Sequence, residues 1–238
     1  MKISNNLFTH FTFSVMAGLA INFSAQKAQA QLALSWSEVR LFASTNRFGT
    51  APDGLNSLTT TDKVNSLSAL NGLGFEADFH LLPWLKGGIR YAGIWTLMTP
   101  DNAPNPPTAF LAVQQTKFGL ILRVPLAEKD WLRFDLFGEA GSANTHIDLQ
   151  TIGSGQGTFS KNGSIYERAG ASLGIGWKSM YVFFEAAQEW NNLDGVSFAG
   201  SLPNSITAID LGGMYYGVGL IFSGIPSWVK IGGSKSDK

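Results

Sequence analysis

Residues 70–98 read LNGLGFEADFHLLPWLKGGIRYAGIWTLM, and this stretch decides the fold. Between Gly72 and Leu81, small or polar residues alternate strictly with apolar ones, which is the period of a β-strand with two unlike faces. The Pro-Trp-Leu sequence at 83–85 predicts a turn. The alternation then resumes as far as Leu97, so the stretch predicts a hairpin of two amphipathic strands.

Pairing across this hairpin separates charged from apolar side chains. A three-residue loop places Asp78 opposite Arg90 and Ala77 opposite Tyr91. In a water-soluble protein, the apolar face would need a second layer of protein. In a bilayer, lipid covers that face and the charged face must line an enclosed interior. The remaining segments decide between these two interpretations.

The composition favours the membrane interpretation. Only 14% of the 238 residues are charged, against about 25% in an ordinary soluble domain, so much of the surface does not face water. The 17 basic and 17 acidic residues balance, and nothing in the charge indicates a nucleic-acid partner. The lack of cysteine in the sequence excludes thiolate metal sites and cysteine nucleophiles.

Residues 1–30 have the organisation of a secretory signal peptide. Lys2 supplies the positive charge, residues 11–21 the apolar core, and Ala28-Gln29-Ala30 a small-x-small cleavage site, so we expect Gln31 to be the mature N-terminus. The alternative is an uncleaved membrane anchor. That run is shorter than the roughly 20 residues of a spanning helix, and it is interrupted by His10, Thr12 and Ser14.

Six further segments alternate in the same way, with lengths near those of tilted membrane strands: 34–42, 110–124, 131–142, 168–178, 181–190 and 212–223. The apolar residues of each strand define its outward face, and the charged residues fall on the opposite, inward face. The cations of this face are Arg40, Lys86, Arg90, Lys117, Arg123, Arg133, Arg168 and Lys178, and its anions are Glu38, Glu76, Asp78, Asp135, Glu139, Glu185 and Glu189. Because buried charges need partners, this near balance predicts a packed network of salt bridges.

The connections between these strands alternate in length. Those after the second, fourth and sixth strands are short, whereas residues 43–68, 99–109, 143–166 and 191–208 predict long loops. Short turns belong at the periplasmic end of a membrane barrel and long loops outside the cell. Tryptophans agree with this, and they predict two interfacial girdles: Trp84, Trp131 and Trp177 at the short turns, and Trp95 and Trp190 at the long loops.

Residues 31–222 resemble, as a pattern, the eight-stranded outer-membrane β-barrels of Gram-negative bacteria, typified by the OmpA transmembrane domain and OmpX. Residues 215–222 (YYGVGLIF) also resemble the insertion signal in the closing strand of such proteins, through Tyr215, Gly217, Leu220 and Phe222. The resemblance implies an all-β, up-and-down transmembrane barrel over 31–223, with outer-membrane lipids and the barrel-assembly machinery as partners. The chain departs from the pattern because residues 224–238 follow the signal, and we expect them to form a short periplasmic tail.

Three classes of function are compatible with this pattern. Eight strands leave an interior just filled by side chains, which favours a non-enzymatic barrel with a structural or surface-interaction role. The alternative is a narrow channel or small-solute carrier. A third class is a barrel enzyme that modifies lipid A, for which Ser142, His146 and Asp148 supply the residue types.

These three residues show no family motif, and they lie close in sequence, Ser142 at the end of a predicted strand and the other two on a predicted loop. We interpret His80 as a hydrogen-bonded member of the interior, because an imidazole without a nucleophile or a second metal ligand beside it supports no catalytic mechanism. No metal-ligand spacing or nucleotide-binding glycine loop stands in the sequence. The sequence therefore predicts no catalytic residue and no cofactor, and it identifies no surface partner.

Overall fold

The structure is a computed structural model, which describes residues 35–48, 67–99, 109–151, 155–201 and 206–223. The predicted signal peptide at 1–30 and the predicted tail at 224–238 lie outside the described residues. Within the described ranges, no helix has the length and apolar character needed to cross a membrane.

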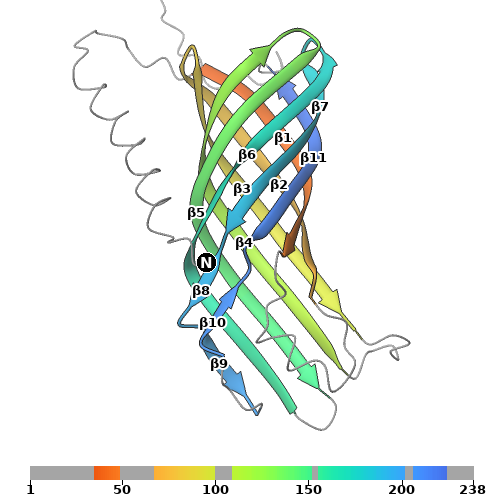
Figure 1. Cartoon of the computed structure of the whole chain (residues 1–238), viewed down its shortest axis with the longest axis vertical. Coiled ribbons are helices and arrows are strands. Elements are labelled where there is room, and N and C mark those ends of the chain that lie inside the picture. The colour runs from red at the N-terminus through yellow and green to blue at the C-terminus, as the bar shows by residue number, and fades with distance from the viewer. Residues whose placement is uncertain (1–34, 49–66, 100–108, 152–154, 202–205, 224–238) are drawn as a thin grey trace, which may run out of the picture. The chain divides into compact units, whose positions relative to one another are not determined.

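Eight antiparallel strands form a closed ring in the order β1-β2-β3-β4-β5-β6-β7-β11, and β11 pairs back onto β1 (Figure 1). Closure leaves none of these eight strands at an edge over its membrane part. The prediction of an eight-stranded up-and-down barrel is confirmed. The strands are β1 (Ser35–Phe48), β2 (Ala69–Leu82), β3 (Leu85–Met98), β4 (Phe110–Glu128), β5 (Leu132–Thr151), β6 (Gly155–Trp177), β7 (Met180–Trp190) and β11 (Gly213–Ser223).

Among the described residues between β7 and β11, where the sequence predicts a long loop, three short strands are present. They are β8 (Asn192–Asp194), β9 (Ser197–Gly200) and β10 (Ala208–Asp210). β8 pairs with β10, and β9 pairs with the part of β6 that lies farthest from the short turns. This connection is therefore folded against the barrel at the end that carries the long connections, which we call the long-loop end.

The register of the first hairpin differs from the prediction. Glu76, not Asp78, lies opposite Arg90, and Ala77 lies opposite Ile89. The reason is a two-residue turn, with Leu82 paired to Leu85, and a bulge between His80 and Leu82. The shift is two residues, so every side chain stays on its predicted face.

The predicted loop at 143–166 is wrong, because β5 and β6 continue through most of it as a long hairpin. Along β5 the alternation persists but changes sign. Thr145, Ile147 and Leu149 are buried inward, whereas Asn144 and His146 are exposed. An outward polar face and an inward apolar face are typical of a sheet in water. The hairpin therefore extends beyond the lipid-covered part of the barrel.

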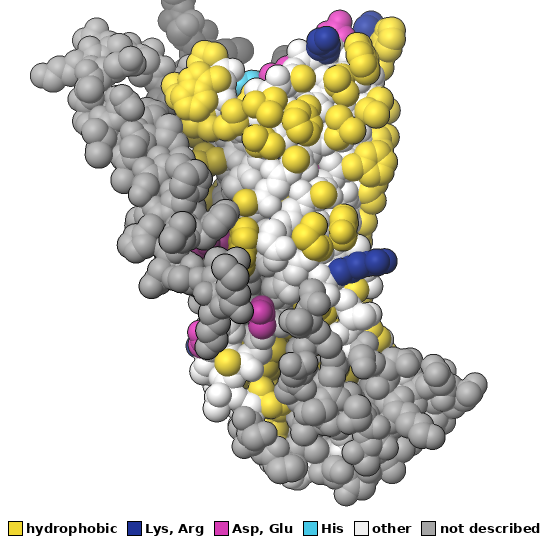
Figure 2. Space-filling model, in the orientation of Figure 1, with side chains coloured by type: hydrophobic (Ala, Val, Ile, Leu, Met, Phe, Trp, Pro, Cys, Tyr) yellow, Lys and Arg dark blue, Asp and Glu magenta, His cyan; other side chains and the backbone are white. Residues whose placement is uncertain are grey.

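Exposed hydrophobic side chains cover the outside of the barrel between its two ends, and we call this surface the apolar belt. Figure 2 shows such side chains gathered over the half of the barrel nearer the short turns. Leu120, in the middle of β4, is 63% exposed. Trp84, Trp131 and Trp177 are exposed beside the three short turns, and Trp95 and Trp190 are exposed nearer the long-loop end.

Replacing Leu120 by arginine tests the position of this belt. Leu120→Arg puts a charge in mid-belt and should lower the free energy of unfolding by about 2 to 4 kcal/mol. Gln114→Arg, on the same face of β4 but at its polar end, should lower it by only about 0 to 1 kcal/mol. Urea unfolding in lipid vesicles measures both values. Equal losses would mean that lipid does not cover Leu120.

Candidate functional site in the barrel interior

The barrel interior contains a network of opposed charges that spans seven of the eight strands. Among the charged residues predicted to face inward, the structure buries all but Arg133, which is partly buried, and Lys178. Lys178 instead lies exposed in the turn before β7, with a positive φ of 54°. We call the buried set, together with Arg133, the charge network. It holds seven cations, Arg40, Lys86, Arg90, Lys117, Arg123, Arg133 and Arg168, and seven anions, Glu38, Glu76, Asp78, Asp135, Glu139, Glu185 and Glu189.

Two arginines and two glutamates form the centre of the network. The Glu76 carboxylate accepts hydrogen bonds from Arg90 Nε at 2.6 Å and from Arg123 Nε at 2.6 Å. The Glu185 carboxylate accepts from the same two guanidinium groups, at 2.8 Å from Arg90 and 2.6 Å from Arg123. All four side chains are at most 3% exposed. Each charge therefore has two opposite neighbours, which offsets the loss of hydration.

Aromatic rings lie against the same guanidinium groups. The Phe42 ring lies 4.6 Å from Arg90 Cζ, and the Phe137 ring lies 4.8 Å from Arg123 Cζ. A guanidinium stacks well on a ring because it is planar and weakly hydrated. The rings thereby fill part of the space between the ion pairs at the centre of the barrel.

The network continues toward the short turns through Glu38. Its carboxylate pairs with Arg40, Arg133 and Lys86, the last at 3.4 Å. Arg40 also donates to Asp135 at 2.8 Å and lies 3.4 Å from Asp78. Lys86 pairs in addition with Glu128, a half-exposed carboxylate that the sequence analysis did not place inside.

Toward the long-loop end, the network continues through Arg168 and Glu189. Arg168 pairs with Glu139 at 3.0 Å and with Glu189 at 2.6 Å, and Lys117 also pairs with Glu189. Arg168 Cζ lies 3.7 Å from the ring of Tyr215. The Tyr166 hydroxyl donates to Glu139 at 2.6 Å.

Farther toward the long-loop end, a short layer of polar side chains separates these charges from a hydrophobic cluster. Gln115 donates to Thr145 at 2.7 Å, and Asn46 donates to Glu189 at 3.1 Å. The cluster beyond them, which we call the apolar plug, joins inward residues of β2 to β6 to residues of the β8–β10 connection. Its buried members are Leu67, Leu70, Ile94, Ala109, Leu111, Val113, Ile147, Leu149, Phe159, Leu193, Ile206, Ile209 and Leu211.

The sequence analysis missed the apolar plug. One signal could have found it: Leu111, Val113, Ile147 and Leu149 are apolar at the positions of their strands that face inward. The contribution of Leu193 and Ile209 had no such signal, because both come from very short strands.

The closed sheet satisfies its backbone within itself, its outside is apolar and its charges are inside. Only such a closed barrel can cross a membrane with strands. The fold is that of a Gram-negative outer-membrane β-barrel.

Solved structures with a similar fold are outer-membrane proteins. Ail, the attachment invasion locus protein of Yersinia pestis, is 12% identical, with a TM-score of 0.44 over 79% of this chain and 100% of that one. The outer membrane protease OmpT of Escherichia coli is 11% identical, with a TM-score of 0.28 over 80% and 95%. LpxR of Salmonella typhimurium is 11% identical, with a TM-score of 0.31 over 78% and 99%. No family model and no curated protein sequence matches the chain.

The candidate enzyme residues lie on the outer face of β5 rather than on a loop. His146 Nε2 lies 3.3 Å from Asp148 Oδ1, and both side chains are substantially exposed. Ser142 lies four residues before His146 on the same strand, which places their Cα atoms about 13 Å apart. The structure therefore brings the imidazole and the carboxylate together but not this serine.

The sequence analysis also interpreted a second histidine, His80, near the end of β2. His80 was predicted to belong to the interior, and this prediction is wrong, because its side chain is exposed near the short turns, beside a bulge in the ladder. Within the described ranges, no group of three His, Cys, Asp or Glu side chains is placed to hold a metal ion.

The residues of the predicted insertion signal lie on both faces of β11. Tyr215 is buried inside the barrel, whereas Leu220 and Phe222 face outward beside β1. Gly217 and Gly219 face inward, and the position that a Cβ of Gly219 would take lies against the Leu41 carbonyl oxygen. A side chain there would force β11 away from β1. Recognition of this segment by the assembly machinery stays a prediction.

Removing one charge from the centre of the network should destabilise the barrel strongly. Glu76→Gln leaves the buried side chains of Arg90 and Arg123 with one carboxylate fewer, and we expect a loss of about 3 to 5 kcal/mol. Glu128→Gln removes a half-exposed partner of Lys86 and should cost less than about 1 kcal/mol. Urea unfolding of the refolded variants measures the difference. A similar small loss in both would mean that the central charges are hydrated.

Proposed function

We propose that this protein is a non-conducting, non-enzymatic outer-membrane barrel that carries a rigid surface outside the cell. The observation that supports this most is the double filling of its interior. The charge network occupies the lumen within the membrane, and the apolar plug occupies it at the long-loop end. The lipids of the outer membrane are its partners along the apolar belt.

The double filling argues against a narrow channel. A permeating ion would have to separate carboxylate and guanidinium groups that lie 2.6 to 2.9 Å apart. It would then cross an apolar cluster whose members Leu111, Val113 and Ile147 have no exposed surface. Both steps are unfavourable, because neither region offers the ion replacement ligands for its water.

The extended hairpin of β5 and β6 supports the surface role. It is stabilised on one side by β4 and on the other by β9, and its buried face packs on the apolar plug. Its outward residues on β5 from Asn144 to Gln150 are polar, as expected for a sheet in water. The barrel therefore holds an ordered polar surface beyond the membrane, which suits a role in contact with other molecules.

Planar-bilayer recording tests the closed interior. The purified barrel should give no stable openings in concentrated potassium chloride, while a wide porin measured in the same bilayers should conduct. The measurement is the current at fixed voltage over many insertions. Regular openings of uniform size would support the narrow-channel alternative and contradict this proposal.

Mass spectrometry of lipid A tests the enzyme alternative. Cells with and without the protein should carry lipid A of the same acyl number, because Ser142 and His146 do not meet. His146→Ala should then leave the lipid A spectrum and the folded state unchanged. A change in acyl number that disappears in His146→Ala would assign the protein to the lipid A-modifying enzymes.

A further inference from the structure

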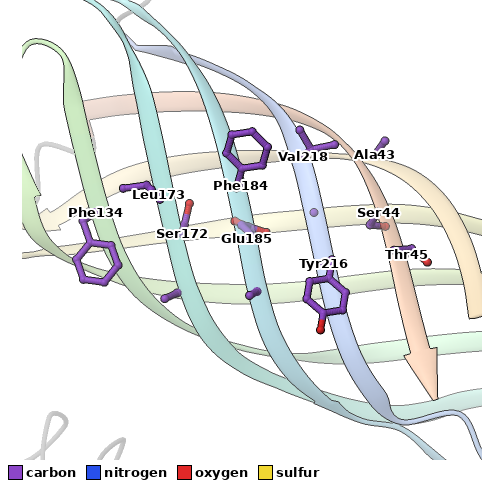
Figure 3. A pocket seen from close by; sticks show the side chains of 13 residues that line it. Ala43, Ser44, Thr45, Phe134, Ser172, Leu173, Phe184, Glu185, Tyr216 and Val218 are labelled. Atoms are coloured by element: carbon purple, nitrogen blue, oxygen red, sulfur yellow. The ribbon is translucent and has the colours of Figure 1, made fainter. Parts of the chain in front are cut away.

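An open groove of about 480 Å³ lies on the outside of the barrel, across β5, β6, β7, β11 and β1. Figure 3 shows Phe134, Phe184 and Tyr216 arranged around it. It shares no residue with the apolar plug, and most of its lining consists of outward side chains of the apolar belt, although Glu185 of the charge network also contributes to it. The proposed function does not use it.

The cross-strand register explains why the wall is hollow here. One row of outward side chains is mostly bulky and runs Phe134, Leu173, Phe184, Val218 and Ala43. The next row toward the long-loop end contains two adjacent alanines, Ala171 and Ala186, followed by Tyr216 and Thr45. The two methyl groups leave a depression between the bulky row and the tyrosine.

The row beyond the alanines is polar at one side. It runs Gly138, Ala169, Gln188, Met214 and Arg47. Arg47 is exposed and lies two residues beyond Thr45 on the same face of β1, which is about 7 Å along the strand. Among the described residues, it forms no ion pair. The groove thus has a largely apolar lining, and the described cation Arg47 lies one row beyond that lining, toward the long-loop end.

We propose that the groove binds one acyl chain of a phosphorylated, multiply acylated lipid of the outer leaflet, of the lipid A class, with the phosphate on Arg47. Most of the lining lies in the belt where lipid is the surrounding solvent, so a hydrocarbon chain is the complementary occupant. A guanidinium pairs with phosphate through two parallel hydrogen bonds. Because Arg47 lies on the long-loop side of the groove, its phosphate belongs to the outer leaflet.

Native mass spectrometry of the full barrel, with lipid A added in detergent, tests this site. The wild-type protein should retain one lipid A molecule. Ala186→Phe fills the groove and should reduce the bound fraction about tenfold, since each buried methylene that is lost weakens binding several-fold. Arg47→Gln should reduce it about fivefold, and Arg47→Lys should restore most of it.

Ala140→Phe is the matched control, because it adds the same ring on the outer face of β5 outside the groove lining. It should bind lipid A as the wild type does. Mobility in cold SDS reports whether each variant is folded. If Ala186→Phe does not fold, the exposed Arg47 variants and lipid A lacking its phosphates still decide the outcome.

Three results would overturn the proposal. Equal binding by wild type, Ala186→Phe and Arg47→Gln would mean that the lipid lies elsewhere. Equal binding of phosphatidylglycerol would contradict a multiply acylated lipid as the occupant, and equal binding of lipid A without phosphates would remove the phosphate contact assigned to Arg47. A dimer that disappears in Ala186→Phe, with no lipid retained by the wild type, would make a second copy of the chain the occupant.

Discussion

Fourteen charged side chains lie inside a sheet that is closed on itself, and the rest of the molecule depends on their pairing. Seven cations and seven anions are present, and the central arginines each contact two or more carboxylates. An unpaired charge at any of these positions would be strongly unfavourable. The pairing in turn fixes the side-chain positions across the barrel, because Arg90 joins β3 to β2, β5 and β7. The network therefore connects strands across the interior of the barrel, whereas the backbone hydrogen bonds connect only neighbouring strands.

The direction in which apolar side chains face reverses along a single strand, β5. Within the membrane, β5 turns apolar residues such as Leu136 outward and Asp135 inward. Beyond the membrane, it turns Ile147 inward and Asp148 outward. The change of sign occurs without a change of secondary structure. It marks where the surrounding solvent changes from lipid to water, and it converts a membrane barrel into a short soluble one.

The features predicted from the sequence are those that depend on alternation alone. Eight strands, their faces and the inward charges followed from residues such as Arg90 and Leu120, whose environment is set by parity. The predicted register of the first hairpin was wrong, because the alternation of residues does not show the bulge near His80. The hairpin at 143–166 was missed because its apolar side faces inward. The plug could not be predicted completely, since Leu193 and Ile209 reach it through the fold of a connection.

Contacts between residues that lie far apart in the sequence have a kinetic consequence. Asn46 donates to the carbonyl oxygen of Leu211, 165 residues later, and Arg40 donates to Ser172, 132 residues later. Contacts at such sequence separation form slowly, because a long loop must close first. Until β11 reaches β1, the inward charges of the early strands lack much of their shielding. Assembly of this barrel should therefore be cooperative, because the last strand closes the ring and thereby holds the charges of β1 beside those of β7, as in the pair of Arg40 and Glu185.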